Sequence, residues 1–174
     1  MKVLFIGGGN MAQAIGHGLI ARGTPAGNIG VIEPVEALRE DWRRRGARAD
    51  AGFAPEQLAA DTLVLAVKPQ AMEAALAPFA GRLGGQLVLS IAAGIRAARL
   101  GRWLGGAGEA YGNIVRCMPN TPALIGAGIS GLVACPGVSP AHRQVAEGLL
   151  ATVGQVRWFD DEAMLDAVTA VSGS

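Results

Sequence analysis

Two observations on the sequence predict an α/β protein whose sheet is doubly wound and mostly parallel. Short apolar runs alternate with helical patterns from residue 3 to about residue 118, which is typical of βαβ units with right-handed crossovers and helices on both faces of a sheet. A glycine cluster, Gly7-Gly8-Gly9, follows the first apolar run directly and precedes the first helical pattern. Together they predict a Rossmann-type fold, with extra strands toward the C-terminus and one trailing helix.

The order of the elements follows from the apolar patterns. The first run, 3–6, has no polar residue and stops at glycine, as a buried parallel strand does. Apolar and small residues then recur at helical spacing and predict a helix that ends before Gly23. Further strands are expected over 29–32, 62–67, 87–90 and 113–118, and helices over 35–45, 70–79 and 97–104. Beyond these we expect a glycine-rich extended segment over 126–134, a helix over 140–151, a strand over 156–159 and a helix beginning near residue 162.

Composition excludes several functional classes. The chain has 15 basic and 14 acidic residues, a balance that argues against a general nucleic-acid binder or a protein held on acidic membranes. Cys117 and Cys135 lack the spacing of a metal site or a disulfide framework, and His17 and His142 have no second ligand nearby, so no metal is expected. No apolar run approaches the roughly 20 residues that span a bilayer, and we expect a cytoplasmic protein with reduced thiols.

The glycine turn has the pattern of a dinucleotide site. Residues 7–12, GGGNMA, fit G-x-G-x-x-A between a strand and a helix. Gly7 allows the tight turn, Gly9 lets the backbone approach a pyrophosphate, and Ala12 allows close packing of helix on strand. The pyrophosphate would lie over the first turn of the helix, where free N–H groups attract an anion. The alternative is a purely structural turn.

Glu33 lies at the end of the second expected strand, about 20 residues after the glycines. A carboxylate in this place accepts hydrogen bonds from the ribose hydroxyls, which favours NADH over NADPH. A 2′-phosphate would be repelled unless a cation intervened, and Arg39 or the basic run 43–45 offers one. The alternative is a solvated strand end before Pro34.

Three further turns follow expected strands, at 66–70, 90–94 and 118–122. Ligands of doubly wound sheets lie beyond the carboxyl ends of the strands, so these turns are candidates for the same site. Ala92 and Ala93 are small enough for a planar ring to lie against the backbone, and Asn120 offers polar groups to a ligand. Lys68 is either a cation near the ligand or an ordinary surface lysine.

The chain also resembles a known family. The segments FIGGGNMAQAI, AVKPQ, SIAAGI, RCMPNTPALIGAG and AVTAVSGS occur in this order, and the chain is similar in them to pyrroline-5-carboxylate reductase, the enzyme of the last step of proline biosynthesis. A generic Rossmann protein would share only the first segment. The resemblance implies an oxidoreductase that transfers a hydride from NADPH or NADH to the C=N bond of 1-pyrroline-5-carboxylate.

The resemblance also implies roles for particular residues. Residues 6–11 wrap the pyrophosphate, 67–69 and 91–93 line the path from adenosine to nicotinamide, and Asn120 lies beside the nicotinamide end. Asn120 and Lys68 are the candidate catalytic residues. The candidate cofactor-binding residues are Ile6, Gly7, Gly8, Gly9, Asn10, Met11, Ala12, Glu33, Val67, Lys68, Pro69, Ile91, Ala92, Ala93 and Asn120.

The sequence departs from the family pattern in three places. Glu33 stands where many members carry a small polar or basic residue, and Phe53 stands where Asn is common. The chain ends at SGS, where the family continues into a helical domain that forms the dimer and supplies most substrate contacts. We therefore expect a dinucleotide-binding domain over 1–160 and the start of the dimerisation domain over 161–174. We expect such a chain to bind cofactor with weak or no activity, to belong to a homo-oligomer when complete, and to expose apolar residues from Met164 to Val171.

Two other interpretations remain open at the level of sequence. One is another reductase with the same N-terminal architecture, such as a β-hydroxyacid dehydrogenase or a deazaflavin-dependent NADP reductase, although MPNTP and SGS argue against both. The other is a nucleotide-binding interaction module without catalysis. The pattern identifies no general acid, and Tyr111 is better explained as a core or loop residue.

Overall fold

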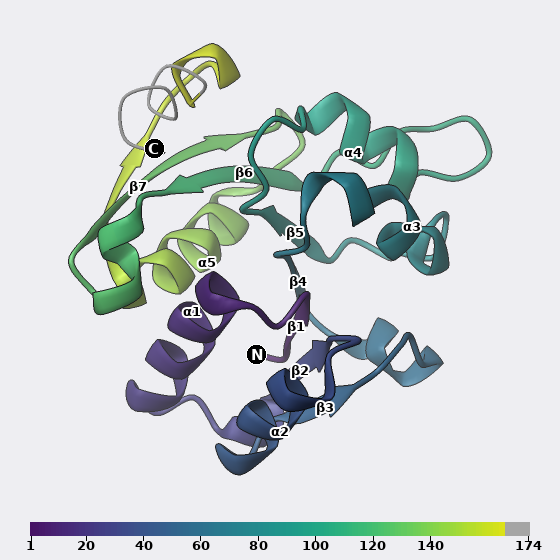
Figure 1. Cartoon of the computed structure of the whole chain (residues 1–174). Helices are drawn as coiled ribbons and strands as arrows, with labels where there is room; N and C mark the ends of the chain where they lie inside the picture. The colour runs from purple at the N-terminus through teal and green to yellow at the C-terminus, as the bar shows by residue number, and fades with distance from the viewer. Residues whose placement is uncertain (166–174) are drawn as a thin grey trace.

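A computed structural model describes residues 1–165, and it has one sheet of eight strands in the order β3-β2-β1-β4-β5-β6-β7-β8 (Figure 1). The strands are β1 (Val3–Ile6), β2 (Ile29–Ile32), β3 (Arg48–Asp50), β4 (Thr62–Leu65), β5 (Leu87–Ser90), β6 (Ile114–Pro119), β7 (Gly128–Ala134) and β8 (Gly154–Trp158). Neighbouring strands pair in parallel from β3 through β6, β7 runs antiparallel to β6, and β8 is parallel to β7. The predicted fold class is confirmed.

Helices cover both faces of this sheet. The α-helices are α1 (Asn10–Ala21), α2 (Glu36–Arg44), α3 (Met72–Leu76), α4 (Ala97–Leu104) and α5 (Pro140–Leu150). Short 3₁₀ helices span Ala26–Asn28, Pro55–Ala59, Pro69–Ala71, Ala77–Phe79, Thr121–Ile125 and Ala151–Val153. One buried cluster joins the sheet to α1, α2 and α5, and a second joins the opposite face to α3 and α4 (Figure 1). Alternate residues of β1 enter the two clusters, because successive side chains of a strand point to opposite faces.

Besides shifts of one or two residues at element ends, the structure differs from the expected elements in two places. β3 is absent from the prediction because it is a short edge strand in which only Ala49 is buried, so no apolar run marks it. The helix expected over 70–79 is broken into Pro69–Ala71, α3 and Ala77–Phe79. Proline has no N–H to donate within a helix, and Pro69 and Pro78 lie in the two 3₁₀ pieces.

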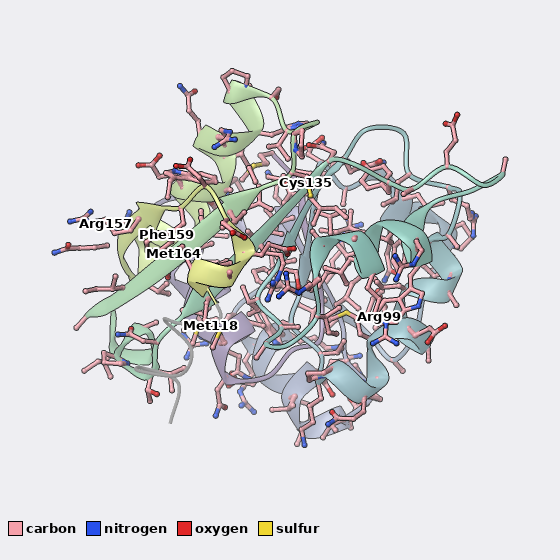
Figure 2. All side chains as sticks on the ribbon, turned by 90° about the horizontal axis from the view of Figure 1, so that it is seen from above. Arg99, Met118, Cys135, Arg157, Phe159 and Met164 are labelled. Atoms are coloured by element: carbon pink, nitrogen blue, oxygen red, sulfur yellow. The ribbon has the colours of Figure 1, made fainter. Side chains whose placement is uncertain are left out.

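The segment after β8 packs back on the sheet. Leu165 is 1% exposed, and its side chain lies against Gly131 of β7 together with Phe159; Figure 2 labels Phe159 and Met164 beside this strand. The expectation of an exposed apolar surface is thus wrong for Leu165, which β7 covers, while Met164 is 50% exposed. Val168 and Val171 lie outside the described residues. Among residues 1–165, no helix is long and apolar enough to cross a membrane.

Candidate dinucleotide-binding site

The glycine turn lies where the strand order reverses. β1 pairs with β2 on one side and with β4 on the other, so the carboxyl ends of these three strands meet around residues 7–9. The turn is tied to both neighbours: the Gly7 N–H donates to the Ile32 carbonyl at 2.9 Å, and the Ala66 N–H donates to the Ile6 carbonyl at 2.8 Å. In doubly wound sheets this switch point is where ligands bind.

Position 7 requires glycine because of its backbone conformation and because of the atoms around it. Its φ is +98°, and a Cβ there would lie 2.8 Å from both the carbonyl carbon and the oxygen of Ala66. Only glycine fits such a place without strain. The turn after β4, which begins at Ala66, therefore lies directly against the glycine turn.

Gly9 meets a different requirement. It is the N-cap residue of α1, no side chain caps this helix end in the described part of the chain, and a Cβ on Gly9 would meet no atom within 4 Å. The first N–H groups of a helix have no partner within it and carry the positive end of its dipole. The space over Gly9 and the start of α1 thus suits a phosphate group, and Ala12, 1% exposed, keeps the helix close to the sheet.

Glu33 lies beneath the glycine turn. It is 7% exposed, and its carboxylate accepts hydrogen bonds from the N–H of Gly8 at 2.8 Å and of Val35 at 2.9 Å. The Gly8 carbonyl accepts from Trp42 Nε1 at 3.0 Å. Both polar groups of the Gly8 peptide are therefore held by side chains, and Glu33 braces the turn, a role that its position in the sequence does not reveal.

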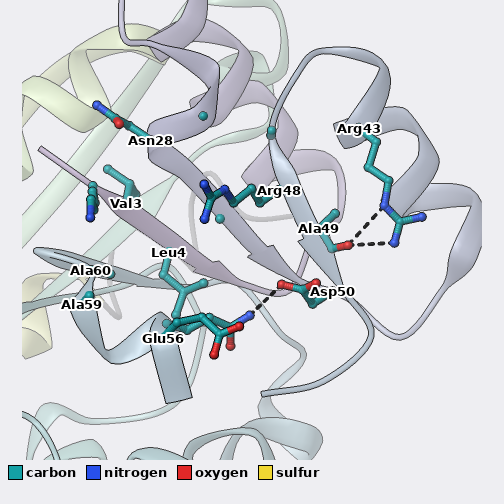
Figure 3. A pocket seen from close by; sticks show the side chains of 15 residues that line it. Val3, Leu4, Asn28, Arg43, Arg48, Ala49, Asp50, Glu56, Ala59 and Ala60 are labelled. Atoms are coloured by element: carbon teal, nitrogen blue, oxygen red, sulfur yellow. Dashed lines mark hydrogen bonds between the residues drawn. The ribbon is translucent and has the colours of Figure 1, made fainter. Parts of the chain in front are cut away.

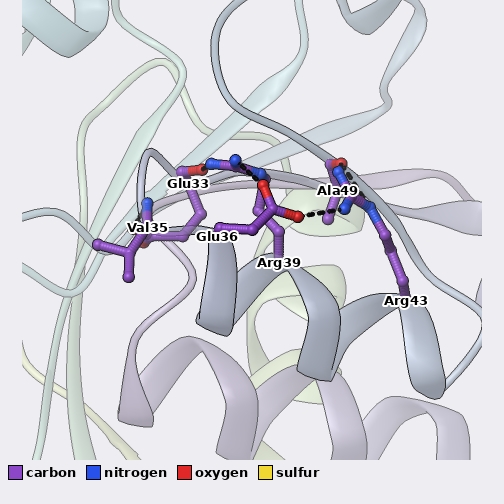
Figure 4. A network of polar contacts seen from close by, with 6 residues as sticks. All are labelled: Glu33, Val35, Glu36, Arg39, Arg43 and Ala49. Carbon is purple, nitrogen blue, oxygen red and sulfur yellow. Dashed lines mark hydrogen bonds and ion pairs between the residues drawn. The ribbon is translucent and has the colours of Figure 1, made fainter.

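A second carboxylate, Glu36 at the start of α2, binds two arginines (Figure 4). Arg39 donates to Glu36 and, at 2.6 Å, to the Glu33 carbonyl. Arg43 donates to Glu36 at 2.7 Å and to the Ala49 carbonyl. Arg39 and then Arg43 lower the pKa of the Glu36 carboxyl below its ordinary value. Arg39 and Arg43 were named from the sequence as possible cations but Glu36 was missed, although spacings of three and seven residues place all three side chains on one helix face.

The turns after β4 and β5 line the same edge of the sheet. The Ile91 N–H donates to the Leu65 carbonyl at 3.1 Å, which fixes the second turn beside the first. Ala92 is 6% exposed and Ala93 is exposed. Lys68 and Pro69 are exposed at the end of β4, next to the half-buried Val67.

Asn120 has a structural contact of its own. Its Oδ1 accepts a hydrogen bond from the Ile129 N–H at 2.9 Å and so closes the connection between β6 and β7. The 3₁₀ helix that follows, Thr121–Ile125, packs beside α1. The sheet topology thus brings the residue 120 region and the glycine turn to one edge.

Two titratable side chains that could donate a proton, Tyr111 and Cys117, lie away from the glycine turn. The Tyr111 hydroxyl donates to the Gln86 carbonyl, just before β5 begins, and therefore lies at the opposite edge of the sheet. Cys117 is 3% exposed, and burial raises the pKa of its thiol far above its ordinary value. In the part of the chain that the structure describes, no group of three or more His, Cys, Asp or Glu could hold a metal ion.

A cavity of about 680 Å³ is separate from this site (Figure 3). Its walls include Lys2, Asn28 and Arg48, which lie at the amino-terminal ends of β1, β2 and β3. The glycine turn lies at the carboxyl ends of the same sheet. The cavity therefore does not mark the candidate site.

Comparisons with known proteins identify relatives of this chain. The model of a family described as NADP oxidoreductase, coenzyme F420-dependent, matches residues 2–94, just over half of the chain. Pyrroline-5-carboxylate reductase of Pseudomonas aeruginosa is 47% identical over 99% of this chain and 63% of its own length. The enzyme of Haemophilus influenzae is 41% identical over 99% of this chain and 62% of its own length.

Solved structures with the same fold include two pyrroline-5-carboxylate reductases. A pyrroline-5-carboxylate reductase of Coxiella burnetii has a TM-score of 0.90 and 33% identity, over 98% of this chain and 63% of its own. The Plasmodium falciparum enzyme, solved with NADP bound, has a TM-score of 0.79 and 25% identity, over 99% of this chain and 62% of its own. The resemblance to pyrroline-5-carboxylate reductase is confirmed, and the chain spans just under two thirds of the length of the curated relatives it matches.

Proposed function

Because the chain belongs to the family described as NADP oxidoreductase, coenzyme F420-dependent, we propose that it is the dinucleotide-binding part of a pyrroline-5-carboxylate reductase. Such an enzyme reduces 1-pyrroline-5-carboxylate to proline, the last step of proline biosynthesis, with NADPH or NADH. The substrate is inferred from relatives that the chain matches over 99% of its residues. The cofactor is inferred from the site, and one observation carries it: Gly9 leaves open space over the uncapped first turn of α1.

The residues at the strand ends fit a dinucleotide. The backbone of Gly9, Asn10 and Met11 would hold the pyrophosphate, with Ile6, Gly7 and Gly8 forming the turn that presents it. Glu33 and the residues after β2 lie where the adenosine ribose of a doubly wound fold is bound. The turns over 67–69 and 91–93 would line the rest of the cofactor, because their backbone lies at the same edge.

When bound, the nicotinamide supplies the hydride that reduces the C=N bond. The residues of this chain would bind the cofactor and orient it toward the substrate. Ala92 and Ala93 have small side chains that leave the backbone of their turn accessible to a flat ring. Lys68, an exposed cation at the end of β4, would attract the carboxylate of the substrate. The Oδ1 atom of Asn120 is engaged by Ile129, so its Nδ2 group would be the donor to a ligand.

The proposal extends to the organisation of the whole protein. We assign residues 1–160 to the dinucleotide-binding domain and residues 161–174 to the start of a helical domain that forms a homo-oligomer and completes the substrate site. On this assignment residues 1–174 by themselves would bind cofactor and would reduce pyrroline-5-carboxylate weakly or not at all. We also expect the complete enzyme in the cytoplasm.

The test measures binding and turnover separately. Calorimetric titration of the chain with NADH and NADPH should give saturable binding of at least one. A fusion of residues 1–174 to the remaining C-terminal part of the Pseudomonas aeruginosa reductase should oxidise the bound nucleotide when pyrroline-5-carboxylate is added. Absence of binding to either dinucleotide would instead support the interaction module. Cofactor binding by a folded fusion that leaves pyrroline-5-carboxylate unreduced would contradict the assigned substrate.

A further inference from the structure

The basic residues of α2, and Arg45 directly after it, all lie beside acids. Arg44 binds Asp41 at 2.8 Å, and Arg45 lies 4.0 Å from the same carboxylate. Arg39 and Arg43 bind Glu36. Each cation that the sequence offered for a 2′-phosphate therefore already has an acidic partner in the structure.

Glu36 is placed where a second anion would compete with it. It begins α2, three residues after Glu33 at the end of β2, and its side chain is 54% exposed. Its two carboxylate oxygens bind Arg39 and Arg43 separately, an arrangement that arginines also use to bind a phosphate. Arg39 is 8% exposed, and its buried Nε has no hydrogen-bond partner among residues 1–165. Glu36 thus occupies the position of an anion between two guanidinium groups.

We propose that Glu36 sets the dinucleotide preference of this chain toward NADH by occupying Arg39 and Arg43, which a 2′-phosphate would need. The inference rests on the proposed function, because it requires the adenosine ribose to lie at the end of β2. A 2′-phosphate carries between one and two negative charges near neutral pH. It would meet the exposed carboxylate of Glu36 while both arginines are engaged, whereas the ribose hydroxyls of NADH carry no charge.

The experiment exchanges Glu36 for a neutral residue of the same shape. Calorimetric titration of the full chain should show NADH binding more tightly than NADPH. In Glu36→Gln the affinity for NADPH should rise about tenfold, since one close negative charge is removed and two arginines lose their carboxylate partner. The affinity for NADH should stay within about twofold.

Two further variants test whether the change in NADPH affinity comes from Glu36 and its arginine partners. Glu40→Gln removes an exposed carboxylate from the same helix, so it controls for net charge and should leave the NADPH to NADH ratio unchanged. Glu36→Gln combined with Arg43→Gln should lose most of the gain, because one of the two arginines is gone. Titration with adenosine 2′,5′-bisphosphate and with AMP repeats the comparison on the adenosine end alone.

The outcomes separate this inference from the proposed function. A chain that binds NADPH ten times more tightly than NADH, or a Glu36→Gln variant with an unchanged ratio, would overturn the role of Glu36 and leave dinucleotide binding intact. A gain that survives the added Arg43→Gln change would overturn the role of Arg43. If neither dinucleotide binds to any folded variant, the proposed function fails and this inference fails with it. Circular dichroism melts establish that each variant is folded.

Discussion

Gly7 and Gly9 are glycines for different physical reasons, and substitution separates them. Gly7→Ala places a Cβ 2.8 Å from the Ala66 backbone at a φ of +98°, and we expect it to lower the free energy of unfolding by about 2 to 3 kcal/mol. Gly9→Ala places a Cβ with no atom of residues 1–165 within 4 Å and should change stability by less than about 0.5 kcal/mol, while weakening dinucleotide binding. Urea denaturation and calorimetric titration measure the two effects. Unchanged binding in a folded Gly9→Ala variant would count against the pyrophosphate position.

Cys117 predicts how stability changes at alkaline pH. Burial raises the pKa of this thiol above its ordinary value of 9.0 in the folded chain, so the unfolded chain loses its proton first. The stability that the protonated thiol contributes is present below pH 9 and is lost as pH rises, by up to about 1.4 kcal/mol per pH unit. Urea denaturation at pH 8, 9 and 10 should show a shallower decline for Cys117→Ala than for the unmodified chain. Equal slopes would contradict the prediction.

For single residues, the sequence predicted where a residue lies in the fold better than it predicted the hydrogen-bond partners of that residue. The glycine turn and the strand-end place of Glu33 followed from local pattern. The partners of Glu33 and of the Gly8 carbonyl did not, because Gly8 is 25 residues from Glu33 and 34 residues from Trp42. The pairing of Arg39 with Glu36 likewise depends on which rotamer each arginine of α2 adopts, and the local pattern does not determine this.

At the scale of elements, the bounds of a helix or strand could be predicted where it contains a clear apolar pattern. β1, β2, β5 and α4 have the bounds that the patterns gave, because each buries most of its apolar residues. β3 has a single buried residue and depends on pairing with β2, so tertiary structure alone reveals it. The turns after β4 and β5 were placed at one edge correctly because parallel strands end together.

One ion pair holds the last described element on the sheet and can be tested. Glu162 Oε1 accepts from Arg116 at 3.0 Å and from the Ala97 N–H at the start of α4 at 2.9 Å. Arg116 is 4% exposed, so Glu162→Gln leaves a buried guanidinium without its counter-charge. We expect the free energy of unfolding to fall by about 2 to 3 kcal/mol, with faster hydrogen exchange at the Ala97 amide. Asp160→Asn, at an exposed position nearby, is the control and should change neither measurement.

At the scale of the whole molecule, one sheet joins the two buried clusters, so a ligand at its carboxyl edge should stabilise the chain as a unit. Binding to the folded state at a ligand concentration of 100 times Kd adds about 2.7 kcal/mol, which corresponds to a rise in Tm of roughly 5 to 10 °C for a domain of this size. Trp42, Trp103 and Trp158 lie in α2, α4 and β8. Tryptophan fluorescence and far-ultraviolet circular dichroism should therefore shift together on adding NADH. Gly9→Ala should shift less at the same concentration. A ligand-dependent shift in only one of the two signals would mean that the halves of the sheet unfold separately.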